Sequence, residues 1–193
     1  APRAAGQWPA RSHARKMLLL DGCVQPAMSP NINAATARVL DRLGIQLQVA
    51  PKAGCCGAIR YHLNDQDGGL DDMRKNIDAW WPYVEAGVEA IVMTASGCGV
   101  TVKEYGHLLA HDAAYVERAE KISALTQDLA EILPTFEKEL AARGIWYFMP
   151  AANGFGKVGI PDIICCYGGK FLAIETKAPG KRNNTTPNQD ARI

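Results

Sequence analysis

The sequence has no long hydrophobic run, no surplus of one charge and no dense set of cysteines. Without an apolar stretch of about 20 residues, it has no predicted membrane-spanning helix. Its 21 basic and 20 acidic side chains give a net charge of +1, so no charged tail for a polyanion is indicated. Six cysteines in 193 residues are too few for a disulfide scaffold. With 48% hydrophobic residues, the composition is typical of a globular protein with reduced thiols, and we expect a cytoplasmic location.

The start of the chain lacks both apolar periodicity and a signal-peptide pattern. It is rich in Ala, Arg and Pro, and its first residue is not Met. We interpret residues 1–16 as a linker that followed a segment further upstream.

Three short apolar runs alternate with helical patterns in the first two thirds of the chain. The runs cover residues 17–20, 45–50 and 90–95, and each has the length of a buried strand. Strands that alternate with helices in this way predict an α/β fold with a parallel sheet and right-handed crossovers.

The helical stretches have recognisable limits. Asn31 or Asn33 is a candidate N-cap for a helix that ends at Gly44. Another helix is predicted after the third apolar run, through Tyr105 to Leu109. Each predicted strand therefore leads into a helix.

Four of the six cysteines directly follow the predicted strands. They are Cys23, the neighbours Cys55 and Cys56, and Cys98, and each motif is flanked by glycine. Because the carboxyl ends of parallel strands lie at one edge of a sheet, where open α/β folds bind ligands, the four thiols can converge on one site. Burial as small apolar side chains is the alternative, but the glycines favour close approach of a cofactor.

These cysteine motifs resemble a known family. The segments DGC at 21–23, GCCG at 54–57 and SGCG at 96–99 are similar to the CCG cysteine-rich domain of heterodisulfide reductase and glycolate oxidase. The stretch up to about Leu133 resembles in particular the carboxyl-terminal part of the iron-sulfur subunit of bacterial glycolate oxidase.

The resemblance implies an electron-transfer module in which the four cysteines bind a 4Fe-4S cluster. Its implied partners are the flavin-containing glycolate oxidase subunits, which oxidise glycolate and pass the electrons on. The 31 residues between Cys23 and Cys55 fit the family's spacing, whereas its closing CxxC motif is present here only as Cys98. Zinc is the competing metal, because four thiolates also complete a tetrahedral zinc site.

Three histidines are weaker candidates for metal ligands. His107 and His111 are four residues apart and can share a helical face, and His62 stands alone. Since no HExxH pattern is present, we interpret all three as solvated or capping residues.

The pattern changes at Pro134, which fits the first turn of a short helix. An aromatic strand at 145–149 and a glycine-rich loop follow. Two more apolar runs, 163–167 and 171–174, are separated by a Gly-Gly pair, which predicts a β-hairpin. We place Cys165 and Cys166 within this hairpin as ordinary strand residues.

Acidic residues flank the predicted hairpin. Asp162 precedes its first strand and Glu175 follows its second, so the two carboxylates can meet at one strand edge and bind Mg²⁺ or Mn²⁺. Lys177 is two residues beyond Glu175 and shares its face of the strand, where it can orient water or neutralise a phosphate. A structural hairpin with solvated charges is the alternative.

The arrangement resembles the PD-(D/E)XK nucleases, and in particular their VRR-NUC branch. The resemblance implies a small α/β nuclease-like core that cleaves DNA with a divalent metal and that is incomplete at the C-terminus. The implied residues are Asp162, Glu175, Lys177 and Gln189 in catalysis, with Asp162, Glu175, Glu137 and Glu139 around the metal.

The two resemblances predict a chimera of a CCG domain at 17–133 and a nuclease-like core at 134–193. The leading hypothesis is an iron-sulfur electron-transfer module fused to the nuclease-like segment. The alternative is a Mg²⁺-dependent DNA nuclease, and a third possibility is that neither activity survives.

Overall fold

The structure is a computed structural model, which describes residues 6–135, 141–142, 146–148, 163–167 and 170–174. The chain forms two compact units, Ala1–Ile132 and Leu133–Ile193. A parallel sheet organises the first unit, and an antiparallel sheet lies in the second.

The first unit is built on a four-stranded parallel sheet in the order β2-β1-β3-β4. Its strands are β1 (Arg15–Leu19), β2 (Ile45–Val49), β3 (Ile91–Met93) and β4 (Thr126–Asp128). Leu18 of β1 lies opposite Gln48 on one side and Ile91 on the other. This sheet confirms the predicted parallel α/β architecture. The sequence does not predict β4, because it is only 3 residues long and only Thr126 in it is fully buried.

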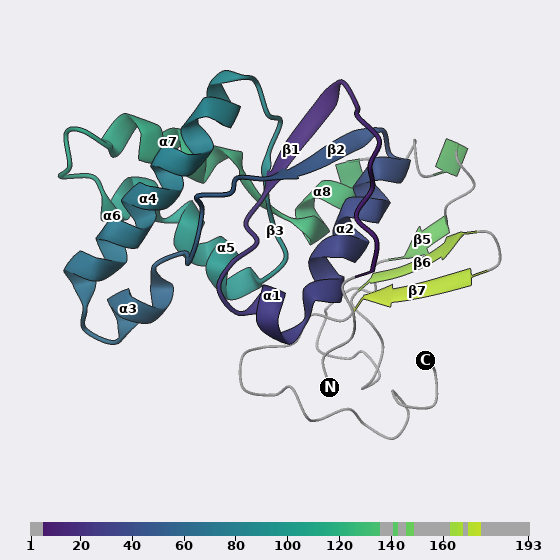
Figure 1. Ribbon diagram of the computed structural model, residues 1–193, viewed down its shortest axis with the longest axis horizontal. Coiled ribbons are helices and arrows are strands. Elements are labelled where there is room, and N and C mark those ends of the chain that lie inside the picture. The colour runs from purple at the N-terminus through teal and green to yellow at the C-terminus, as the bar shows by residue number, and fades with distance from the viewer. Residues whose placement is uncertain (1–5, 136–140, 143–145, 149–162, 168–169, 175–193) are drawn as a thin grey trace. The chain divides into compact units, whose positions relative to one another are not determined.

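Helices connect these strands and cover the sheet (Figure 1). They are α1 (Gln25–Met28), α2 (Pro30–Arg42), α3 (Ala58–His62), α4 (Gln66–Glu85), α5 (Ser96–Lys103), α6 (Tyr105–Leu108), α7 (Val116–Leu125) and α8 (Leu129–Thr135). Figure 1 shows α2 on one side of the parallel sheet and α4 to α7 on the other. No helix in the described part of the chain is long and apolar enough to cross a membrane.

The central strand β1 is buried on both faces. Leu18 and Leu20 join a core cluster that contains Trp80 and Tyr105. Leu19 is also fully buried, and since alternate strand residues point to opposite faces, it faces the α2 layer. Burial on both faces explains why β1 reads as a continuous apolar run.

The boundaries of α2 differ in part from the prediction. The helix begins at Pro30, and the side chain of the preceding Ser29 makes no capping hydrogen bond. Asn31 and Asn33 therefore lie inside the helix and do not cap it. Proline fits the first turn, where its missing N–H has no helical partner. The helix ends before Gly44 as predicted, with a positive φ of 76° at that glycine.

The helix predicted through Tyr105 is interrupted and forms the two short helices α5 and α6. Glu104 separates them with φ −91° and ψ −2°. The N–H of Gly106 donates to Ser123 Oγ at 3.0 Å instead of continuing the helical ladder. The interruption therefore has a specific cause in the packing of α7.

The second unit contains an antiparallel sheet in the order β5-β6-β7. Its strands are β5 (Trp146–Phe148), β6 (Ile163–Tyr167) and β7 (Lys170–Ile174). Ile163 pairs with Ile174, and the predicted hairpin is confirmed. The nuclease-like core is not confirmed, because most of the predicted first helix, the glycine-rich loop and the acidic residues lie outside the described residues.

Candidate functional site

Four cysteines lie beyond the carboxyl ends of β1, β2 and β3. Cys23 follows β1, Cys55 and Cys56 lie between β2 and α3, and Cys98 lies in the first turn of α5. Since these three strands are adjacent and parallel, the loops that leave them meet at one edge of the sheet. The structure therefore brings together the four cysteines that the sequence singles out.

The four thiols form two pairs. The Sγ atoms of Cys23 and Cys55 are 3.6 Å apart. The thiol of Cys56 donates a hydrogen bond to Cys98. Electrostatic interactions also join the pairs, because Cys23 and Cys55 both act on Cys98. A hydrogen bond also links the neighbours Cys55 and Cys56, so the two pairs form one cluster of sulfur atoms.

The pairing separates the acidities of the thiols. Partial burial and the hydrogen bond with Cys55 raise the pKa of Cys23 to about 11. The hydrogen bond to Cys98, together with burial, raises the pKa of Cys56. The same hydrogen bond lowers the pKa of Cys98 below its ordinary value of 9.0. The surroundings of Cys98 therefore favour its thiolate form.

A polar network supports the loop that carries Cys23. The amide of Asn33 in α2 donates to the carboxylate of Asp21 at 2.7 Å, and its oxygen accepts from Thr94 Oγ1 at 2.7 Å. Gln25 Nε2 donates to the backbone oxygen of Thr94 at 3.2 Å. These bonds join the loop after β1 to the loop after β3, which fixes the spacing of the two loops.

Two fully buried side chains hold the backbone of the loop with the cysteine pair. Asn76 of α4 accepts a hydrogen bond from the N–H of Gly54 at 2.8 Å and donates to the oxygen of Cys55 at 2.7 Å. The hydroxyl of Tyr105 donates to the oxygen of Cys56 at 2.8 Å. Neither residue is predicted from the sequence as part of the site. The available signal is that Asn76 is a polar residue on the apolar face of its helix.

Gly57 allows the chain to turn from this loop into α3. Its φ is +88°, which favours glycine. A Cβ atom here would lie 2.6 Å from the backbone oxygen of Gly69 in α4. The glycine after the cysteine pair is therefore required by backbone conformation and by close packing.

The chemistry of the donor set fits a thiol-bound metal or cluster. Thiolates are ligands of iron-sulfur clusters and of zinc, and no carboxylate or imidazole interrupts the set. Within the residues that the structure describes, no three or more His, Cys, Asp or Glu side chains are arranged around a common point as metal ligands. Ligation would therefore replace the direct contacts within each thiol pair by bonds from sulfur to the metal.

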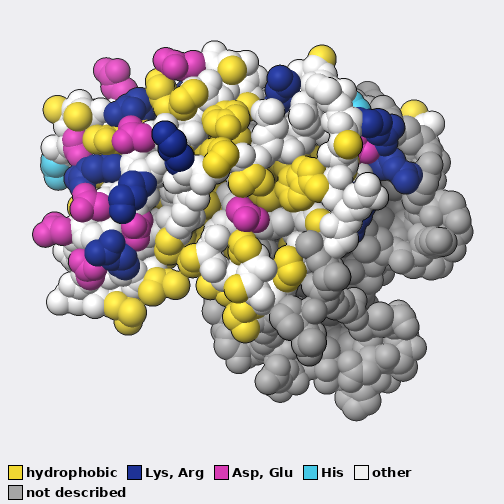
Figure 2. Space-filling model, viewed as in Figure 1, with side chains coloured by type: hydrophobic (Ala, Val, Ile, Leu, Met, Phe, Trp, Pro, Cys, Tyr) yellow, Lys and Arg dark blue, Asp and Glu magenta, His cyan; other side chains and the backbone are white. Residues whose placement is uncertain are grey.

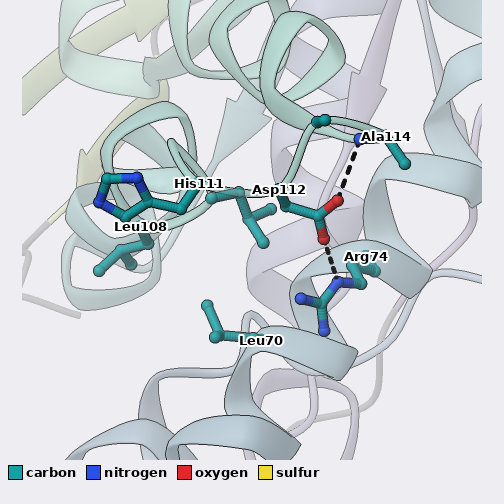
Figure 3. Close-up of a pocket in the computed structure, with 8 residues that line it drawn as sticks. Leu70, Arg74, Leu108, His111, Asp112 and Ala114 are labelled. Atoms are coloured by element: carbon teal, nitrogen blue, oxygen red, sulfur yellow. Dashed lines mark hydrogen bonds and ion pairs between the residues drawn. The ribbon is translucent and has the colours of Figure 1, made fainter.

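The three histidines lie apart from this set. His62, His107 and His111 are all exposed on their helices or loops. His111 lines a separate surface cavity of about 440 Å³, in which Arg74 Nε donates to Asp112 Oδ2 at 2.8 Å. Figure 3 shows that the imidazole of His111 points away from this ion pair. The cavity contains no cysteine, and its charged groups already bind each other.

The predicted nuclease site lies outside the described residues. This holds for all its predicted members, Asp162, Glu175, Lys177, Gln189, Glu137 and Glu139.

The cysteine geometry agrees with a comparison against known families. Residues 17–103 match the family CCG, a cysteine-rich domain. The matched range contains Cys23, Cys55, Cys56 and Cys98. This class of domain is the one that the sequence resembles, and the match confirms that part of the prediction.

Similar curated proteins specify the resemblance further. The chain is 58% identical over 137 residues to the glycolate oxidase iron-sulfur subunit of Escherichia coli (strain K12), which covers 70% of this chain and 34% of that protein. It is 29% identical over 119 residues to the probable glycolate oxidase iron-sulfur subunit of Bacillus subtilis (strain 168), covering 62% of this chain and 26% of the relative. Lactate utilization protein A of Bacillus cytotoxicus is 25% identical over 118 residues, covering 61% of this chain and 47% of the relative.

The chain is thus homologous to a glycolate oxidase iron-sulfur subunit but spans only about a third of that relative's length. No solved structure matches. Nothing in the comparisons supports the VRR-NUC resemblance or a DNA partner, so the nuclease remains a prediction from sequence alone.

Proposed function

We propose that this chain carries an electron-transfer module of a glycolate oxidase-type iron-sulfur protein, with Cys23, Cys55, Cys56 and Cys98 as cluster ligands. The convergence of four thiols from three loops carries the proposal, since soft thiolates are the ligands of iron-sulfur clusters. The names of the relatives supply the reaction, the oxidation of glycolate or a related hydroxy acid.

A bound cluster would take up and release single electrons. The residues of the chain would prepare the ligands, orient them and limit access of water. Each thiol must lose its proton on ligation, and the lowered pKa of Cys98 favours this loss at Cys98. The buried Cys56 provides the shielded side of the site, and Cys23 the exposed side. Reduced thiols of this kind also suit the cytoplasmic location predicted from the sequence.

Exposed apolar side chains next to the thiols support contact with partner subunits. Val24 follows Cys23, and Val100 lies two residues beyond Cys98 in α5. Ile59 lies in α3 and Leu63 follows that helix. All four apolar side chains are exposed. Figure 2 shows hydrophobic side chains gathered over α1, whereas charges of both signs mix over α4. We infer that a flavin-containing subunit, or another electron carrier of the complex, covers this apolar surface.

A structural zinc site is the second candidate, and one distance favours it. Four sulfur atoms around zinc with bonds of about 2.3 Å lie roughly 3.8 Å apart. The 3.6 Å between the sulfur atoms of Cys23 and Cys55 is close to this spacing. The family has a closing CxxC motif, whereas this chain has only Cys98 at that place. Four cysteine ligands therefore remain, and four also suit a closed zinc site. We prefer the cluster to zinc because the relatives are named iron-sulfur subunits.

Replacement of single cysteines tests the proposal. The full chain, purified without air, is compared with Cys55→Ser and with Cys165→Ser as the matched control, because Cys165 also precedes a second cysteine. We expect the wild type and the control to show broad visible absorbance and the electron paramagnetic resonance of a reduced cluster, and Cys55→Ser to lose both. Retention of the signals in Cys55→Ser, or a colourless wild type that contains zinc, would reject the cluster.

A further inference from the structure

The backbone of the loop with the cysteine pair is bound by side chains from two different helices. Asn76 contacts Gly54 and Cys55, and Tyr105 contacts Cys56, so three consecutive loop residues are held. Asn76 Nδ2 also donates to the Tyr105 hydroxyl at 3.2 Å, which joins the two side chains. Both residues are 0% exposed.

We call Asn76 and Tyr105 the clamp. The polar groups of both side chains are hydrogen-bonded. The side-chain oxygen of Asn76 accepts from the N–H of Gly54, and its nitrogen donates to the oxygen of Cys55. A neighbouring β-strand would bind the backbone in the same way. The Tyr105 hydroxyl donates one hydrogen bond and accepts another. Burial of amide and hydroxyl groups is unfavourable unless they are hydrogen-bonded, and here nearly all their bonds serve the loop.

Packing fixes the position of the clamp. The ring of Tyr105 stacks on Trp80, with centroids 6.5 Å apart and an interplanar angle of 19°. Asn76 lies between Met73 and Trp80 on the buried face of α4. Because the rings and the helix are part of the core, the hydroxyl and the amide have little freedom to move.

We propose that Asn76 and Tyr105 are positioning residues that direct the thiol of Cys55 to Cys23 and the thiol of Cys56 to Cys98. The inference rests on the proposed function, because the purpose of this arrangement is to present both sulfur atoms to one bound group. The carbonyls next to the two side chains are fixed, so the two Cα–Cβ directions are fixed as well. This explains how two adjacent cysteines that contact each other also reach Cys23 and Cys98.

The test compares Tyr105→Phe with Thr126→Val in the metal-free full chain. Each variant removes one buried hydroxyl. Thr126 lies at the start of β4, and its Oγ1 donates to the oxygen of Ile122 in the preceding α7 at 2.8 Å. The probe is iodoacetamide, and the readout is the alkylation rate of the tryptic peptide 53–60, which contains both cysteines of the pair. Fragment ions assign the modification to one or the other.

We expect Tyr105→Phe to accelerate alkylation of Cys56 by roughly fivefold to tenfold, the factor that loss of one hydrogen bond gives. Thr126→Val should leave the rate unchanged. An equal rate in wild type and Tyr105→Phe, or an equal acceleration in both variants, would overturn the inference. Asn76→Ala supplies a second arm, with faster alkylation of Cys55 as well.

A second readout separates this inference from the proposed function. If the wild type holds metal, Tyr105→Phe should lose it to a chelator several times faster than Thr126→Val does, and equal rates of loss would count against the clamp. If the wild type holds none, the proposed function fails, while the alkylation rates still decide whether the clamp positions the thiols.

Discussion

Removal of the Asn33 side chain is expected to destabilise the first unit strongly. Its amide donates to the Asp21 carboxylate at 2.7 Å and accepts from Thr94 at 2.7 Å, and the residue is only 3% exposed. A hydrogen bond to a charged group contributes about 1.5 to 3 kcal/mol and a neutral one about 1 kcal/mol. Asn33→Ala should therefore lower the free energy of unfolding by about 3 kcal/mol and lower Tm by about 6 to 12 °C.

The matched control for this prediction is Thr36→Ala, one turn further along α2. Thr36 is equally buried, but its hydroxyl binds only to the oxygen of Ile32 in the same helix, at 3.0 Å. Its replacement should change the free energy of unfolding by about 1 kcal/mol or less. Urea unfolding followed by circular dichroism measures both variants. If Asn33→Ala were no less stable than Thr36→Ala, the network would not join the two loops as argued.

Three further predictions concern the turn after the cysteine pair, the thiols and the nuclease. Gly57→Ala should cost about 3 kcal/mol or more in urea unfolding, whereas Gly87→Ala, at a similar φ of +86° but in open space, should cost about 1 kcal/mol. Because the thiolate is the reactive form, alkylation of Cys98 in the metal-free chain should become fast below pH 9, and that of Cys23 only near its pKa of about 11; the reverse order in peptide mass spectra would contradict the pairing. The nuclease stays a prediction from sequence: Mg²⁺-dependent cleavage of flapped DNA that disappears in Asp162→Ala would support it, and a wild type that does not cleave would reject it.

The positions of the cysteines could be predicted because local sequence determines them. Apolar runs with strand length define β1, β2 and β3, and each run is followed within a few residues by a glycine-flanked cysteine. Parallel strands end at one edge, so the topology alone brings Cys23, Cys55 and Cys98 close together. The hairpin of β6 and β7 was predictable for the same local reason, a pair of apolar runs around two glycines.

The supporting residues were not predictable in this way, because they act over long distances in the chain. Asn76 is 21 residues beyond the carbonyl that it binds, and Tyr105 is 49 residues beyond its own. Asn33 is a candidate helix cap in the sequence because asparagine favours that position. In the structure it lies inside α2, and its side chain binds Asp21. Tertiary contacts decide the role of such residues, and single-residue preferences do not contain them.

Iron, zinc and acid-labile sulfide in the anaerobically purified full chain decide whether the cysteines bind a cluster. We expect about four iron atoms and about four sulfides per chain, held by thiolates. One zinc without sulfide would contradict the electron-transfer function and make the cysteine site structural. A chain free of both metals would contradict ligation at Cys23, Cys55, Cys56 and Cys98 altogether.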